Sequence, residues 1–124
     1  MKSGKFSKAS PQADDYMDFF YSMGMPMLLR GTRYLATAAS ISSEEQLIHG
    51  GVTKEVYPAV AKIHNTSAQS VERCMRWAIA SFWENEENRD LIPDFFLNST
   101  KSLTGRKPTN SEFLMIVKKR IPKE

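Results

Sequence analysis

A helical apolar pattern with one polar break occupies residues 52–83 and constrains the fold more than any other stretch. After the break, apolar residues recur every three or four positions, as on the buried face of a helix. Thr66, with Gln69 three positions later, fits a capping box, so the sequence predicts a helix from Ser67 to Trp83. Its predicted buried face comprises Ala68, Val71, Met75, Ala78, Ile79 and Phe82.

A shorter helix is predicted before the break at Asn65-Thr66. Pro58 fits only in a first turn, where its missing N–H costs no internal hydrogen bond, so this helix should start near Val56 or Tyr57. A short helix, a tight connection and a longer helix with polar side chains form a helix-turn-helix pattern. Spacing alone fits DNA binding and an ordinary two-helix corner equally well. The shorter helix would pack through Val56, Val60 and Ile63, with Tyr57, Ala61 and His64 beside them.

The polar side of the longer helix gathers side chains that suit the reading of base edges. Gln69, Glu72, Arg73, Arg76 and Trp77 are spaced so that they share one outward face. An arginine fork matches O6 and N7 of guanine, and a carboxylate accepts from N4 of cytosine. Adjacent Glu72 and Arg73 therefore suit a site that contains a C·G pair. Alternatively, Glu72 and Arg76, four apart, form a surface ion pair worth about 0.3 to 0.5 kcal/mol.

Several motifs in register resemble one known family. The runs VTKEVYPAVAKIHNTSAQSVERCMRWAI and KPTNSEF are similar to the C-terminal DNA-binding domain of the stage zero sporulation master response regulators. That family shows TK-x-LYP-x-IAK, then NTT-x-x-x-VERAIRHAI, then KPTNSEF. The similarity also includes Met23 to Pro26 and Arg30 to Leu35, so it covers the chain from about residue 14 onward. It implies an all-α bundle of about five to six helices, with a helix-turn-helix effector domain over residues 13–124.

The resemblance and the outward face together predict a site for double-stranded DNA. Gln69, Glu72 and Arg73 are expected to read base edges in the major groove, as in a sequence-specific transcription regulator. In the family the KPTN segment abuts the duplex, although Thr109 or Asn110 could at the same time cap a last helix. Contacts to the DNA backbone, or support for it, are expected from Lys54, Ser70, Arg76, Trp77, Lys107 and Asn110.

The chain departs from the family pattern in three respects. The family has arginine at Ser70 and histidine at Trp77, so the resemblance implies a shifted target or a lower affinity. Its members also carry an N-terminal receiver domain, for which 124 residues leave no room. Residues 1–12 are expected to be a mobile basic tail or a linker remnant. These departures favour a second hypothesis, a protein-interaction module that pairs with a full-length regulator or competes with it.

Composition narrows the remaining classes of protein. A net charge of +3 and a pI near 9.1 permit nucleic-acid binding without demonstrating it. A single cysteine, Cys74, with no secretory signal and no long apolar run, predicts a cytoplasmic protein without a membrane span. His49 and His64 stand apart and no phosphate-binding glycine motif occurs. We therefore expect no enzyme, metal, cofactor or small-molecule substrate; the resemblance implies tandem self-association on DNA.

The helices before residue 52 and after residue 83 are predicted in less detail. Asp14 or Asp15 would cap a first helix that Gly24 ends, and Pro26 would lie in the first turn of a second helix. Residues 42–45 would either continue this helix or restart a short one. Residues 84–94 carry a net charge of −4 and precede one further predicted helix, whereas the chain from residue 101 onward carries +5. The second helix would bury Leu28, Leu29, Tyr34, Leu35, Ala38 and Ile41.

Overall fold

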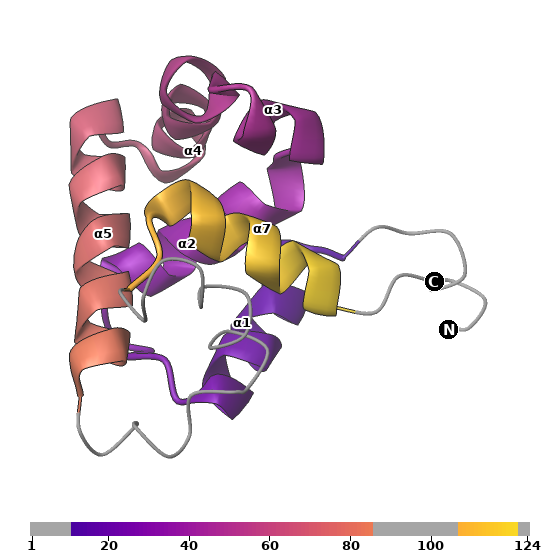
Figure 1. Ribbon diagram of the computed structural model, residues 1–124. Coiled ribbons are helices and arrows are strands. Elements are labelled where there is room, and N and C mark those ends of the chain that lie inside the picture. Colours follow the sequence, from indigo (N-terminus) through magenta and orange to yellow (C-terminus); the bar gives the residue numbers. More distant parts are fainter. Residues whose placement is uncertain (1–10, 86–106, 122–124) are drawn as a thin grey trace, which may run out of the picture.

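The computed structural model describes residues 11–85 and 107–121, and within them every regular element is helical (Figure 1). The predicted all-α fold is confirmed. Most of the predicted tail, most of the acidic segment and the further predicted helix lie outside the described residues. The elements are α1 (Ala13–Met23), α2 (Arg30–Ile41), α3 (Glu44–Ile48), a π-helical turn η2 (Val52–Val56), α4 (Tyr57–His64), α5 (Ala68–Glu84) and α7 (Asn110–Arg120).

Helix α5 forms one side of the bundle, and α2 and α7 both extend from it across the bundle, with α7 in front of α2 in this view (Figure 1). Five residues of the predicted α5 stripe are buried, and only Ala68 is partly exposed. The Phe20 and Phe113 rings, 5.8 Å apart between centroids, join α1 to α7. This shared core fixes the direction of α5. The buried stripe residues are Val71, Met75, Ala78, Ile79 and Phe82.

Helix α2 crosses α5 at close range at Gly31. A Cβ atom placed on Gly31 would overlap the backbone carbonyl of Cys74 and would lie 3.0 Å from the Cβ of Ala78. Because the obstacle is a backbone group, a side chain at this position cannot be accommodated by a rotamer change alone. A glycine is therefore required for the two helices to pack at this distance.

The connection between α4 and α5 differs by one residue from the prediction. Asn65 adopts the left-handed conformation, with φ 56°, and ends α4. Thr66 then donates its N–H to the Ala61 carbonyl at 2.9 Å, which completes the end of α4. Ser67 is the N-cap of α5, and its side chain accepts from the Ser70 N–H at 3.1 Å. The predicted capping box of Thr66 and Gln69 was wrong, because Thr66 is used to close the preceding helix.

The starts of α1 and α2 also differ from the predictions. Gln12 is the N-cap of α1, and Asp15 accepts its N–H at 2.8 Å, so neither aspartate is the N-cap. Gly24, with φ 87°, ends the helix as predicted. Pro26 begins a turn, not α2, and its carbonyl accepts from the Thr32 hydroxyl at 2.8 Å. This turn leaves Leu28 completely exposed, against the prediction that it is buried.

The predictions for α3 and α4 were partly confirmed and partly wrong. Ser43 and Gln46 form a capping box, so the chain restarts as the short helix α3 and does not extend α2. The turn η2 was not predicted; it leads directly into α4, where Pro58 occupies the first turn as expected. Ile63 and Ile41 were predicted to be buried, but their side chains are 59% and 41% exposed. None of the helices described is long and apolar enough to cross a membrane.

Candidate nucleic-acid interface

The exposed face of α5 carries the side chains that were predicted to point outward. Gln69, Arg73 and Arg76 are exposed, the Trp77 side chain is 64% exposed, and Glu72 is half-buried at the edge of the face. The buried stripe anchors the opposite side of the helix, so this face is presented to solvent along its length. Ser70 is half-buried, with its hydroxyl 3.9 Å from the Cys74 sulfur.

Glu72 and Arg76 form an ion pair on this face. The Arg76 Nε lies 2.9 Å from Oε2 of Glu72, and Nη2 lies 3.3 Å from Oε1. The hydrogen bond to the carboxylate raises the pKa of Arg76. The ion-pair alternative from the sequence is therefore present in the structure. Among the described residues Arg73, by contrast, has no carboxylate partner.

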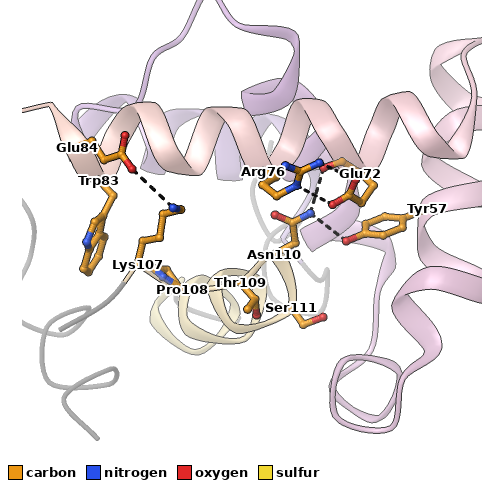
Figure 2. Close-up of a pocket in the computed structure, with 10 residues that line it drawn as sticks. All are labelled: Tyr57, Glu72, Arg76, Trp83, Glu84, Lys107, Pro108, Thr109, Asn110 and Ser111. Atoms are coloured by element: carbon orange, nitrogen blue, oxygen red, sulfur yellow. Dashed lines mark hydrogen bonds and ion pairs between the residues drawn. The ribbon is translucent and has the colours of Figure 1, made fainter. Parts of the chain in front are cut away.

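A hollow of about 550 Å³ lies between α5 and the start of α7 (Figure 2). Lys107 reaches across it, with Nζ 3.6 Å from Oε2 of Glu84. Thr109 caps α7: its hydroxyl accepts from the Glu112 N–H at 3.2 Å, and the Glu112 carboxylate accepts from the Thr109 N–H at 2.9 Å. The predicted capping role of this segment is confirmed. The hollow is lined by Tyr57, Glu72, Arg76, Trp83, Glu84, Lys107, Pro108, Thr109, Asn110 and Ser111.

Asn110 ties three helices together at the inner end of this hollow. Its side chain is buried, and Nδ2 donates to the Tyr57 hydroxyl at 2.9 Å and to the backbone carbonyl of Glu72 at 3.2 Å (Figure 2). Burial is the main cause that raises the pKa of Tyr57. Asn110, predicted as a backbone-contacting or supporting residue, thus holds α7 against α4 and α5. Tyr57 was not identified from the sequence as part of this support.

Replacing Tyr57 with phenylalanine is expected to lower the free energy of unfolding by about 1 kcal/mol, because the buried Asn110 amide loses an acceptor. Urea unfolding followed by circular dichroism measures the change. Tyr21→Phe is the matched control, since the Tyr21 side chain is 73% exposed. An equal, small effect of both variants would show that the hydroxyl of Tyr57 contributes nothing.

A second, smaller hollow of about 370 Å³ lies beside α5, where α2 begins. Arg73 and Trp77 line it from α5, and Arg30 lines it from the first turn of α2. The sequence did not single out Arg30, since its place beside α5 depends on the tight crossing at Gly31. The other lining residues are Leu29, Gly31 and Cys74.

The exposed face of α5 lies in a part of the chain that matches a known protein family. Residues 17–121 match the family model described as Sporulation initiation factor Spo0A C terminal. The matched range includes the two helices around the break, the face of α5 and the KPTNSEF segment, and it covers most of the 124 residues. The chain belongs to this family. The Spo0A C-terminal family consists of DNA-binding effector domains of a sporulation regulator, so the resemblance noted from the sequence is confirmed.

In this Spo0A C-terminal domain, the predicted site residues lie at several separate locations. Glu72, Arg76, Lys107 and Asn110 surround the larger hollow, whereas Arg73 and Trp77 line the smaller one. Gln69 lies in the first turn of α5, next to Ser70. Lys54 is exposed on η2 and lines neither hollow.

His64, beside the break, has a packing role. Its Nε2 lies 2.8 Å from the Thr37 hydroxyl, and its ring lies 5.0 Å from that of Tyr34. Burial, followed by the charge of Arg33, lowers the pKa of His64. In residues 11–85 and 107–121, no three His, Cys, Asp or Glu side chains converge as metal ligands would.

Proposed function

We propose that this domain binds DNA sequence-specifically as a transcription regulator, with α5 in the major groove. The observation that carries the proposal is the row of Gln69, Glu72 and Arg73 on the N-terminal half of α5, in a chain of the Spo0A C-terminal family. Gln69 and Arg73 are exposed, and Glu72 is half-buried beside them. In helix-turn-helix proteins the N-terminal residues of the recognition helix contact base edges. The 17-residue helix is long enough to lie along the groove, at roughly 25 Å.

The ion pair on α5 is compatible with base reading. A carboxylate has about four acceptor positions, so Glu72 can accept from a cytosine amino group while it keeps its hydrogen bonds to Arg76. The pair also offsets the repulsion between this carboxylate and the phosphates. Arg73 supplies the fork for the paired guanine. The N–H groups of Arg76 that do not bind Glu72 would donate to phosphates.

The larger hollow supplies contacts to the DNA backbone. Arg76 and Lys107 line it from opposite sides, and together with Lys54 they would bind phosphates. Such contacts position the protein on the duplex and carry no base information. The proposal therefore separates specificity, assigned to Gln69, Glu72 and Arg73, from general affinity.

Enrichment of bound duplexes from a random-sequence pool tests the proposal, because the pool contains every short target sequence. We expect repeated rounds to recover one short box that contains a C·G pair. Recovery of duplexes without a common sequence would refute sequence-specific binding. The enriched box then serves as the probe for the variants below.

Glu84 is expected to weaken DNA binding, because its carboxylate holds Lys107 at 3.6 Å and lies near the proposed phosphate contacts. Glu84→Gln should tighten binding to the box and to a scrambled duplex alike, by up to about fivefold at low salt. Fluorescence anisotropy measures both affinities. Glu44→Gln, which removes the same charge from the exposed first turn of α3, is the control. Equal affinities for the two variants would show that Glu84 does not restrain Lys107.

A further inference from the structure

The two hollows flank the exposed face of α5 on opposite sides. In the first three turns of α5, Glu72 and Arg76 line the larger hollow, whereas Arg73, Cys74 and Trp77 line the smaller one. The two hollows share no lining residue. Helix α7 borders the first hollow and α2 borders the second. A helix in the major groove has a phosphate backbone on each side, because the groove is about 12 Å wide. Each hollow would therefore face a different DNA strand.

The α2 side carries two cations that the proposed function does not use. Arg30 and Arg33 are both exposed and are three residues apart, so they lie on neighbouring turns of one helix face. Arg30 lines the hollow beside Arg73 and Trp77. Arg33 directly precedes Tyr34, whose ring lies 5.0 Å from that of His64 at the end of α4. The two cations thus follow α5 from its middle toward its beginning, and neither has a carboxylate partner in the described ranges.

The hollow itself suits the uncharged part of a nucleotide. Trp77 is 64% exposed, and the hollow beside it is lined by Leu29, Gly31 and Cys74 between two arginines. An apolar surface bordered by cations matches a sugar between phosphates. The same charge pattern would also attract an acidic peptide, but this hollow is continuous with the face of α5 through Arg73 and Trp77.

We propose that Arg30 and Arg33 bind phosphates of one DNA strand, with Trp77 packed on a deoxyribose, while Arg76 and Lys107 bind the opposite strand. This inference rests on the proposed placement of α5 in the major groove. It adds α2 to the DNA-binding surface and accounts for the requirement for a close α2–α5 crossing, since that crossing brings Arg30 beside Trp77.

The salt dependence of duplex binding tests the two arginines. Arg30→Gln and Arg33→Gln should each weaken binding to box and scrambled duplexes alike, by roughly tenfold at about 0.1 M salt, and lower the salt slope by about 0.9. Trp77→Ala should weaken binding without changing the slope. Lys119→Gln, in the last turn of α7, is the matched control and should leave the slope unchanged. Thermal unfolding verifies that each variant is folded.

Duplexes with single neutral methylphosphonate linkages assign each cation to a strand. The wild-type domain should lose affinity when certain linkages on either strand are neutralised. Arg30→Gln should become insensitive on one strand only, and Lys107→Gln on the other. If both α2 variants kept the wild-type salt slope and the wild-type sensitivity to each methylphosphonate linkage, the inference would be overturned. An acidic protein partner would then be the better candidate for binding in the hollow.

The same measurements distinguish a failure of the α2 contacts from a failure of sequence-specific binding. Equal wild-type affinity for box and scrambled duplexes would refute sequence reading alone, while the slopes would still decide the role of α2. A wild-type preference for the box, with unaltered α2 variants, would refute the α2 contacts alone. A wild-type domain that binds no duplex would overturn both.

Discussion

Replacing Gly31 with alanine is expected to destabilise the fold by about 3 kcal/mol, although alanine favours a helix over glycine by about 1 kcal/mol. The added methyl group would overlap the Cys74 carbonyl, so α2 and α5 would have to separate and lose packing along their crossing. Overpacking against backbone is not relieved by rotamer changes. The expected sign is therefore opposite to that of intrinsic helix propensity.

Urea unfolding followed by circular dichroism measures the effect of Gly31→Ala. Arg33→Ala is the control for helix propensity, because Arg33 is exposed on the same helix. A Gly31→Ala variant as stable as the wild type, or more stable, would contradict the close crossing. Such a result would also remove the structural basis for placing Arg30 beside Trp77.

Replacing Arg73 with alanine is expected to cost about 1 to 3 kcal/mol of binding free energy on the enriched box, through the loss of a bidentate contact to guanine. Affinity for a scrambled duplex should change much less. The selected sequence should become relaxed at one base pair. Anisotropy titrations with the box, with single-base variants and with the scrambled duplex measure all three quantities.

Lys107→Ala provides the comparison for Arg73→Ala. It should weaken binding to all duplexes alike, because a phosphate contact carries no base information. If Arg73→Ala also weakened every duplex equally, Arg73 would be a backbone contact. Arg73 would then act together with Arg30, which lines the same smaller hollow, as a phosphate contact.

The features that the sequence predicted well are those set by local periodicity or by the backbone properties of proline and glycine. The buried stripe of α5, the start of α4 before Pro58 and the end of α1 at Gly24 all agree with the structure. The capping residues were less accurate. Thr66 and Ser67 are chemically similar caps, and the choice depends on Asn65 closing α4 in the left-handed conformation. Periodicity does not report which residue takes that conformation.

The support of the site depends on contacts that no local pattern contains. The hydrogen bond between Asn110 and Tyr57 joins residues 53 apart in the sequence. The position of Arg30 depends on a backbone contact between Gly31 and Cys74. Leu28 was assigned to the core because it is apolar, but the turn at Pro26 directs it into solvent. The outward face of α5 was predictable, and the family resemblance indicated Lys107 and Asn110 on one border. Arg30 on the other border, and the contacts that hold both borders in place, were not predictable.

The most direct test of the central claim is a pair of anisotropy titrations of the wild-type domain, with the enriched box and with a scrambled duplex of equal length and composition. Both are run at about 50 mM and about 200 mM salt, since phosphate contacts make affinity depend on salt. Reading by Gln69, Glu72 and Arg73 predicts that both affinities fall as salt rises and that the preference for the box persists. Equal affinities for the two duplexes at both salt concentrations would contradict sequence-specific recognition by α5.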